Sequence, residues 1–556
     1  MKRLLLLVLA LPLLFVGATF APPGVSPEAT EASRRPNIIL ILTDDEDAKL
    51  IDRHQERFPA LRSLKEDGTT FESFFVSLAL CCPSRATILR GQYAHNTEIF
   101  TNALPGGGFQ KFRDLGEEES TVATWLHDAG YRTVLLGKYL NGYPQTTHVP
   151  PGWDEWYGVA GGVNFYNYWL NENGQLVRYR AGAEHYLTDV LADKAQDFIW
   201  RTTHAPRECR SRKDAAAGVP EGCRRPPFFM YLAPYAPHGP ATPAPRHLDA
   251  FPGVAAPRPP SFNEADVGDK PAWLQTWPLL TRQQIANIDQ QYGRRLRSML
   301  AIDDLLADVV QMLQVTGQLE HTYIFYTADN GFHLGEHRLT QGKNTGFEED
   351  IRVPLLVRGP GVPARRALPH LAANIDLAPT FAALAAAAVP DFVDGRSLVP
   401  LLGQQPPAVD SWRHALLLEH GFPAGSGRSS PSGGLAQGQD QGASGSLEEL
   451  DPFEEAAPAQ PAQVRQPAPV FQGLRTAQYK YIEYVAGARE LYDLHADPNE
   501  LDNRIEKADP ALVARLAARL DDLRACARAG CREAEDGPLA AGQSRLQGPR
   551  QRSAGR

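Results

Sequence analysis

Residues 37 to 47 read "NIILILTDDED", an apolar run that ends abruptly in acidic side chains. Every position from Ile38 to Leu42 is apolar, so a strand here must be covered on both faces, as in a parallel sheet between layers of helices. In open sheets of this kind, ligands bind beside the carboxyl ends of the strands. The stretch therefore predicts an α/β fold and puts Asp44 and Asp45 at its functional edge.

The same arrangement recurs along the chain. Further short apolar runs occupy residues 132–137, 228–232, 322–327 and 353–358. Lys138 follows the first of these runs, and His238 lies just beyond the second. Asp329 and Asn330 follow the third. Because helical patterns separate the runs, we expect an α/β domain over about residues 34–400, with these side chains converging on one crevice.

The C-terminal part, residues 401–535, has a different pattern and predicts a small antiparallel α+β subdomain. Gly, Ser, Gln, Ala and Pro dominate at about 424–468, which predicts a disordered insertion that cannot bury a core. Alternating aromatic residues at 473–503 predict a hairpin. Residues 537–556 are expected to be a flexible tail.

The amino terminus predicts export. A short basic start precedes an apolar run from Leu4 to Val16 that is short for a bilayer span. We interpret residues 1–21 as a secretory signal peptide, with an uncleaved anchor as the alternative. We expect a secreted or periplasmic protein with no stable membrane anchor, bacterial rather than lysosomal because the chain has no Asn-x-Ser/Thr sequon. The net charge of −9 argues against nucleic acid as the main partner.

Four of the six cysteines suit an oxidising compartment. Cys209 and Cys223 bracket an insertion, and Cys526 and Cys531 close the short loop "CARAGC". Each pair is predicted to form a local disulfide. The adjacent pair Cys81–Cys82 is left without this explanation.

The acidic strand ends form a candidate metal site. Asp44, Asp45, Asp329 and Asn330 offer only oxygen atoms, a set that suits Ca²⁺, with Mg²⁺ as a second candidate, and disfavours zinc. Taken alone, "TDDED" could be a helix cap and "ADNG" a turn. Their shared position after apolar strands favours a metal site.

The segment "CCPSRATILR" predicts a helix with Pro83 in its first turn and Cys81 just before its N-terminus. Two interpretations of Cys81 remain open on this physics. It could be a small buried residue at the helix end or a thiol nucleophile with a lowered pKa.

The motifs of the whole chain then decide between them. "CCPSRATILRG" contains Cys-x-Pro-Ser-Arg, and the chain resembles the type I, formylglycine-dependent sulfatases from residue 35 to about 503. The other stretches that carry the resemblance are "RPNIILILTDDED", "GKYLNGY", "APHGP", "YTADNGFHLGEH", "NIDLAPT" and "ELYDLHADPNELDN". "LCCPSR", "GKYLN" and "PPGWDEWYG" are most similar to N-acetylglucosamine-6-sulfatases and heparan 6-O-endosulfatases.

The resemblance implies an alkaline-phosphatase-like sandwich, with a large mixed, mostly parallel sheet flanked by helices. It implies that a formylglycine-generating enzyme oxidises Cys81 to an aldehyde, and that the aldehyde hydrate attacks the sulfur of a sulfate ester and later releases sulfate. Residue 81 would also ligate the metal. Cys82, at the variable position, would be a packing residue.

The resemblance also assigns roles to four further side chains. Arg85 would hold the formylglycine hydroxyl, and Lys138 and Lys343 would bind the sulfate. His238 would protonate the leaving oxygen. Many sulfatases have a histidine where this chain has Leu140, so the base for sulfate release is not assigned; His95, His333 and His337 are more typical of structural or substrate-facing positions.

The sequence therefore predicts a calcium-dependent sulfatase acting on a sulfated carbohydrate, with the 6-O-sulfate of N-acetylglucosamine as the expected target. The alternatives are a general arylsulfatase, a phosphomonoester or phosphonate hydrolase, and a catalytically silent glycan-binding protein. Aromatic residues from Trp153 to Trp169 could form a sugar-stacking wall or simply pack in the core.

Overall fold

Strand β1 (Asn37–Thr43) is buried on both faces, as its unbroken apolar sequence requires. Its even-numbered apolar residues belong to one hydrophobic core and its odd-numbered ones to another. Its neighbours β10 (Phe228–Ala233) and β11 (Thr322–Ala328) both run parallel to it. The carboxyl ends of three strands therefore lie side by side at one edge of the sheet.

The computed structural model describes residues 35–162, 164–204, 208–209, 223–421 and 467–537. In this part of the chain the main sheet has the strand order β13-β2-β12-β11-β1-β10-β4-β5-β6-β7. The strands not yet given are β2 (Thr69–Phe71), β4 (Arg132–Gly137), β5 (Glu155–Ala160), β6 (Trp169–Glu172), β7 (Gln175–Arg178), β12 (Leu355–Arg358) and β13 (Arg366–Leu368). Two short strands, β3 (Phe74–Phe75) and β14 (Ala372–Ala373), pair beside it.

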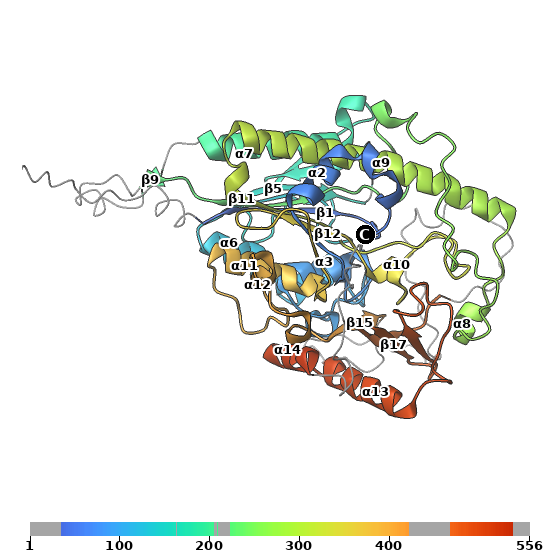
Figure 1. Ribbon diagram of the computed structural model, residues 1–556. Coiled ribbons are helices and arrows are strands. Elements are labelled where there is room, and N and C mark those ends of the chain that lie inside the picture. Colours follow the sequence, from blue (N-terminus) through green and yellow to red (C-terminus); the bar gives the residue numbers. More distant parts are fainter. Residues whose placement is uncertain (1–34, 163, 205–207, 210–222, 422–466, 538–556) are drawn as a thin grey trace, which may run out of the picture. The chain divides into compact units, whose positions relative to one another are not determined.

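Helices cover both faces of this sheet (Figure 1). One face carries α2 (Pro59–Asp67), α7 (Leu187–His204) and α9 (Arg282–Val315). The other carries α3 (Cys81–Arg90), α6 (Val122–Asp128) and α11 (Leu377–Ala385). The observed layers are those expected of an alkaline-phosphatase-like sandwich.

The last apolar run of the domain corrects one expectation. Residues 355–358 form β12, but β12 runs antiparallel to β11, with Thr327 opposite Leu355. An apolar run shows that a strand is buried on both faces but carries no information on its direction. The sheet is therefore mixed, with a parallel centre of β11, β1, β10 and β4.

The C-terminal segment adds a second, antiparallel sheet. Its strands are β15 (Ala415–His420), β16 (Phe471–Thr476), β17 (Tyr479–Tyr484) and β18 (Arg489–Asp493). Helices α13 (Pro510–Arg524) and α14 (Ala529–Asp536) follow. The predicted hairpin is thus part of a four-stranded meander. Its first strand, β15, was not predicted from the sequence.

Shared apolar packing attaches this sheet to the larger one. Leu416, Leu474 and Tyr481 belong to the same hydrophobic core as the even-numbered residues of β1. The described residues from Pro36 onward form one compact unit, and the boundary proposed at residue 400 stays a prediction.

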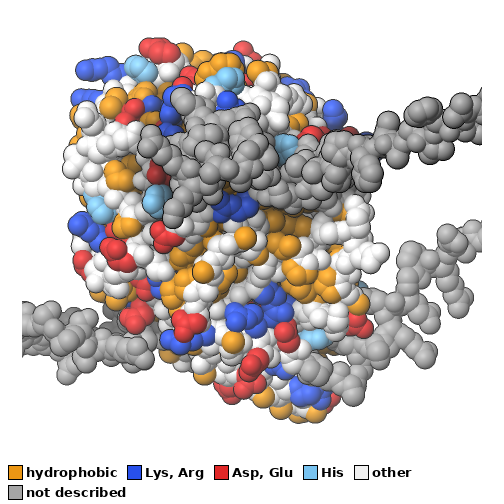
Figure 2. All heavy atoms as spheres, turned by 90° about the vertical axis from the view of Figure 1, so that its left-hand side faces the viewer, with side chains coloured by type: hydrophobic (Ala, Val, Ile, Leu, Met, Phe, Trp, Pro, Cys, Tyr) orange, Lys and Arg blue, Asp and Glu red, His pale blue; other side chains and the backbone are white. Residues whose placement is uncertain are grey.

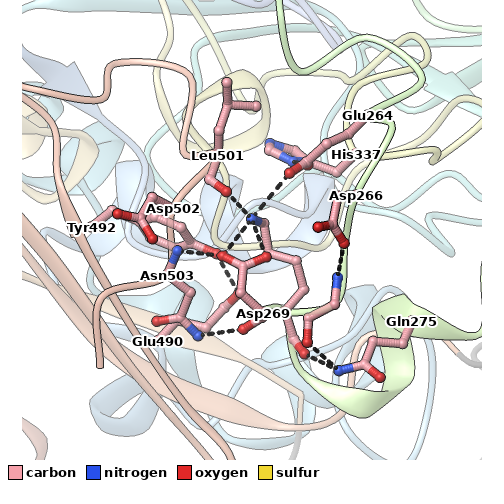
Figure 3. A network of polar contacts seen from close by, with 12 residues as sticks. Glu264, Asp266, Asp269, Gln275, His337, Glu490, Tyr492, Leu501, Asp502 and Asn503 are labelled. Atoms are coloured by element: carbon pink, nitrogen blue, oxygen red, sulfur yellow. Dashed lines mark hydrogen bonds and ion pairs between the residues drawn. The ribbon is translucent and has the colours of Figure 1, made fainter. Parts of the chain in front are cut away.

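Lys270 forms a second attachment, and Figure 3 shows its partners Glu264, Asp269 and Leu501. Its Nζ donates to the Leu501 carbonyl at 2.7 Å and lies 3.2 Å from Glu264 Oε1 and 3.1 Å from Asp269 Oδ1. The Asn503 amide groups also donate to Asp269. The segment 264–275 is thereby tied to the chain that follows β18.

One predicted disulfide is present, between Cys526 and Cys531, with a Cα–Cα distance of 4.8 Å. Cys209 and Cys223 are paired in backbone register across the short strands β8 (Glu208–Cys209) and β9 (Cys223–Arg224), and their disulfide stays a prediction. The signal peptide at 1–21, most of the insertion at 424–468 and the tail after Gly537 lie outside the described residues.

The surface in Figure 2 carries basic and acidic side chains interspersed with apolar ones. Among the described residues, none of the helices combines the length and the apolar character needed to span a bilayer.

Candidate active site

Nine side chains singled out in the sequence come together beside the carboxyl ends of the parallel strands. Six parts of the fold supply them: the segments after β1, β4, β10 and β11, helix α3, and the loop before α10 (Glu348–Ile351). All are buried, with Lys343 the most exposed at 8 %. The nine are Asp44, Asp45, Cys81, Arg85, Lys138, His238, Asp329, Asn330 and Lys343.

The oxygen-bearing side chains lie in direct contact. The Asp45 amide donates to Asp329 Oδ1 at 3.1 Å, and Asn330 Nδ2 donates to Asp45 Oδ1 at 2.7 Å. Potential ligand atoms of Asp44, Asp45, Cys81 and His238 all lie within 4.8 Å of one another.

The Asn330 side chain shows that this pocket is not fully satisfied by protein contacts. Its Oδ1 is buried and accepts no hydrogen bond from the described part of the chain. A buried carbonyl oxygen without a donor costs free energy unless a cation or another donor meets it. With the neighbouring carboxylates, it offers the donor set of a hard cation.

Cys81 stands at the N-terminus of α3 and faces this pocket. Its Sγ is 3.5 Å from Asp44 Oδ1 and accepts from Lys343 Nζ at 2.9 Å. Cys81 is the first residue of the helix rather than the one before it, because the Ser84 amide already bonds the Leu80 carbonyl. Pro83 is therefore third, where its missing N–H still costs nothing.

The pKa of the Cys81 thiol argues against the interpretation of Cys81 as a thiol nucleophile. Burial, against the opposing effect of Lys138 and Lys343, raises the pKa of Cys81 well above its ordinary value. A neutral thiol is a poor nucleophile. Desolvation therefore outweighs the neighbouring lysines here, which is opposite to the lowered pKa considered from the helix position.

Three cations neutralise the three carboxylates. Arg85 Nε donates to Asp329 Oδ2 at 2.7 Å, and its Nη1 donates to the Lys138 carbonyl at 3.0 Å. Lys138 Nζ is 2.6 Å from Asp44 Oδ2, and Lys343 Nζ is 2.6 Å from Asp45 Oδ1. The sulfur atom of Cys81 therefore lies among paired charges, with Lys343 Nζ 2.9 Å and Asp44 Oδ1 3.5 Å away.

These contacts control the ionisation of the carboxylates. Burial alone would raise the pKa of Asp44, but Lys138, followed by His238 and Arg85, holds that pKa well below its usual range. Lys343 likewise keeps the pKa of Asp45 low despite burial. Burial and the charge of Asp44 raise the pKa of Asp329. The pocket thus contains at least two firmly ionised carboxylates.

His238 is held in one orientation. Its Nδ1 is 2.7 Å from the Gly239 carbonyl, which can only accept, so this nitrogen carries a proton. Its Nε2 lies 3.7 Å from Asp45 Oδ2. The nitrogen that can exchange a proton with a ligand is therefore the one on the pocket side.

Two buried residues next to the pocket were not predicted from the sequence. Glu46 accepts from Thr43 Oγ1 at 2.7 Å and from the Tyr326 hydroxyl at 2.6 Å, and burial raises its pKa to about 7. Arg295 of α9 donates to the Asp45 carbonyl. The available signal was a lone arginine on the apolar face of a helix, three residues after Tyr292 and four before Met299.

The other histidines and aromatic residues have structural surroundings. His95 contacts Glu419, His333 contacts Asp350, and His337 contacts Glu264. Leu140 is buried in the core. Trp153 and Trp156 are also core residues, so the packing interpretation holds for them rather than a sugar-stacking wall.

Known proteins are similar to this chain in sequence and in fold. The sulfatase family model matches residues 36–387. Human N-acetylglucosamine-6-sulfatase is 35% identical over 542 residues, which cover 94% of this chain and 90% of that protein. An arylsulfatase of Volvox carteri is 33% identical over 536 residues, covering 90% of this chain and 76% of that one.

A solved structure of a protein in complex with D-glucosamine-2-N,6-O-disulfate has a TM-score of 0.67 and 24% identity. The match covers 88% of this chain and 98% of the chain in that structure. This likeness concerns the fold.

Proposed function

Since the chain belongs to the sulfatase family and is a sulfuric ester hydrolase, we propose that it removes the 6-O-sulfate from N-acetylglucosamine in sulfated glycans. The observation that carries the catalytic part of the proposal is the position of Cys81. Its sulfur lies between Lys343 and Asp44, at the N-terminus of a helix and beside an oxygen-lined pocket.

Residue 81 is proposed to be the nucleophile after oxidation to formylglycine by a formylglycine-generating enzyme. The aldehyde would supply, as its hydrate, a hydroxyl that attacks sulfur. The raised pKa of the unmodified thiol supports this, because a buried neutral thiol would not perform the reaction itself.

Asp44, Asp45, Asp329 and Asn330, together with residue 81, are proposed to hold Ca²⁺, with Mg²⁺ as the weaker candidate. The unsatisfied Asn330 oxygen and the absence of imidazole from these four ligands support a hard cation. When bound, the ion would draw negative charge from the sulfate oxygens and from the attacking group.

The basic side chains are proposed to bind the sulfate group. Lys138 and Lys343 carry their ammonium groups within 3 Å of the pocket carboxylates, and Lys343 also touches residue 81. Arg85, anchored on Asp329, is proposed to orient the hydroxyl of residue 81. Such fixed donors stabilise the charge that develops during transfer.

His238 is proposed to protonate the sugar oxygen as it leaves sulfur. Its Nδ1 is committed to a backbone carbonyl, which leaves Nε2 to deliver the proton. A sugar alkoxide is a poor leaving group, so this proton transfer matters most for the natural substrate class.

The substrate assignment rests on the relative that matches nearly the whole chain, N-acetylglucosamine-6-sulfatase. To test it, the purified protein would be assayed on N-acetylglucosamine carrying sulfate at O6 or O3, on 2-O-sulfated uronic acid and on an aryl sulfate. We expect the 6-O-sulfate to have the highest kcat/KM. Hydrolysis of the aryl ester alone would contradict the sugar assignment and favour a general arylsulfatase.

Two further measurements separate the remaining alternatives. Mass spectrometry of the peptide around residue 81 should detect formylglycine; an unmodified thiol in native protein would favour a silent glycan-binding protein. Chelation followed by addition of Ca²⁺, Mg²⁺ or Zn²⁺ should restore activity best with Ca²⁺. Faster turnover of phosphate or phosphonate esters than of sulfates would favour the second hydrolase class.

A further inference from the structure

Asp45 adopts a backbone conformation that it would not choose alone. Its φ is 66°, in the left-handed region that an L-residue other than glycine occupies only when its surroundings hold it there. Glycine would adopt this conformation readily, but it has no carboxylate to act as a metal ligand. Something else must therefore stabilise this turn.

Two hydrogen bonds hold the backbone of Asp45, one to its N–H and one to its carbonyl. The Asp45 N–H donates to Asp329 Oδ1 at 3.1 Å. The Asp45 carbonyl accepts from Nη2 of Arg295, a residue with 0 % exposure on helix α9. The first partner is itself a proposed ligand, whereas Arg295 belongs to none of the groups assigned so far.

Arg295 also contacts the segments that follow two further strands of the pocket, β10 and β11. Its Nη1 is 3.5 Å from the Pro237 carbonyl, one residue before His238. Its guanidinium lies 4.3 Å from the ring centre of Phe332, two residues after Asn330. One planar group thereby meets the segments that follow β1, β10 and β11.

We propose that Arg295 is a positioning residue that locks Asp45 in its left-handed conformation and fixes the segments bearing His238 and Asn330 against it. The oxygen ligands would then be arranged before the cation arrives. This inference rests on the proposed function, because it assumes that Asp45 binds Ca²⁺.

The direction in which Ca²⁺ affinity changes when Arg295 is removed separates a positioning role from a purely electrostatic one. Arg295 is a cation close to a cation site, so by Coulomb's law alone its removal should tighten Ca²⁺ binding. If its role is to hold Asp45, removal should weaken binding. Lysine keeps the charge but cannot span two carbonyls and stack on a ring as a planar guanidinium does.

The test uses the full chain, freed of metal by chelation, with Arg295→Gln and Arg295→Lys. Titration calorimetry measures the Kd for Ca²⁺, and the Ca²⁺-induced rise in melting temperature measures it independently. We expect the Kd to rise at least about tenfold in Arg295→Gln, the range seen when residues supporting metal ligands are removed. We expect a smaller rise in Arg295→Lys.

Arg297→Gln is the matched control. Arg297 lies on the same helix, and its Nε donates to the Ala250 carbonyl at 2.7 Å, with Phe251 as a second acceptor. Its loss removes the same kind of bonds away from the pocket, so its Kd for Ca²⁺ should match that of the unsubstituted protein.

The outcomes are distinct. An unchanged or lower Kd in Arg295→Gln would overturn the inference, as would equal weakening in Arg297→Gln. If Arg295→Gln does not fold, a Kd for Arg295→Lys equal to that of the unsubstituted protein overturns it. Absence of both Ca²⁺ binding and sulfatase activity in the unsubstituted protein would overturn the proposed function first and this inference with it.

Discussion

At the scale of single residues, the adjacent cysteines offer a matched pair of substitutions. Cys81 faces Asp44 and Lys343, whereas Cys82 belongs to the hydrophobic core. Cys81→Ala should lower kcat/KM by roughly 10⁴-fold or more, as loss of a nucleophile does. Cys82→Ala should cost about 1 kcal/mol of stability and leave kcat within a few-fold.

Steady-state kinetics and denaturant unfolding on both variants check this prediction. The roles of the two cysteines would be reversed if Cys82→Ala were inactive yet stably folded. Comparable activity in Cys81→Ala would remove the nucleophile assignment altogether.

His238 permits a second residue-level prediction, based on the leaving group. A general acid contributes roughly 10²–10⁴-fold when the leaving oxygen needs a proton. His238→Gln should therefore lose about that factor on a sugar 6-sulfate and much less on a nitrophenyl sulfate. Parallel kcat measurements on the two substrates check it. Equal losses on both would show that His238 acts on binding or folding instead.

At the scale of elements, the end of β4 depends on one glycine. Gly137 has φ +108°, and a Cβ there would lie 2.0 Å from the Ala233 carbonyl oxygen. That same oxygen accepts the Lys138 amide at 2.8 Å. The close approach of β4 and β10 therefore fixes the backbone of the lysine proposed to bind sulfate.

Gly137→Ala should consequently lower stability by at least about 2 kcal/mol and impair activity. Gly116→Ala is the control, because Gly116 has φ +73° but no neighbour within 4 Å. Its cost should be only the conformational one of about 1 kcal/mol. Melting temperatures and KM for a sulfate ester would be compared; similar behaviour of the two variants would refute the steric argument.

The elements also show what a sequence can and cannot reveal. Apolar strand runs and the acids that follow them located β1, β4, β10, β11 and the oxygen-lined pocket. The direction of β12 was not readable, because a buried strand has the same apolar pattern in either direction. Lys343 lies in a loop without a periodic signal, so only the family resemblance pointed to it. The strand pattern placed His238 near the crevice, but only the resemblance gave it a role. Arg295 contributes through its position on α9, which only the packing reveals.

At the scale of the whole molecule, a partly buried histidine links the N-terminal part of the chain to its C-terminal part. His95 Nδ1 contacts Glu419 Oε1 at 3.0 Å, and its Nε2 contacts the Cys526 carbonyl at 2.9 Å. Both partners accept, so the ring must carry two protons. Although burial opposes it, the charge of Glu419 raises the pKa of His95 from 6.5 to about 9.

A pKa raised by folding makes stability depend on pH in a fixed direction. The contribution of His95 should be complete below pH 6.5 and lost as the pH rises through about 9. At about 1.4 kcal/mol per unit, it amounts to about 3 kcal/mol. Denaturant unfolding from pH 6 to 9.5 should show this decline in the unsubstituted protein.

His95→Gln should flatten that decline, whereas substitution of the exposed His204 by glutamine should leave it intact. A parallel fall in His95→Gln and the unsubstituted protein would show that other groups cause the pH dependence.

The depth of residue 81 has a consequence for timing. Its side chain has 0 % exposure, and the strand that supplies Asp329 is made almost 250 residues later. The oxidising enzyme proposed for residue 81 would have to reach the sulfur atom directly. It would therefore have to act while the polypeptide is still being synthesised or exported, because once the later strands join, a molecule that missed this step would keep a buried, ordinary thiol.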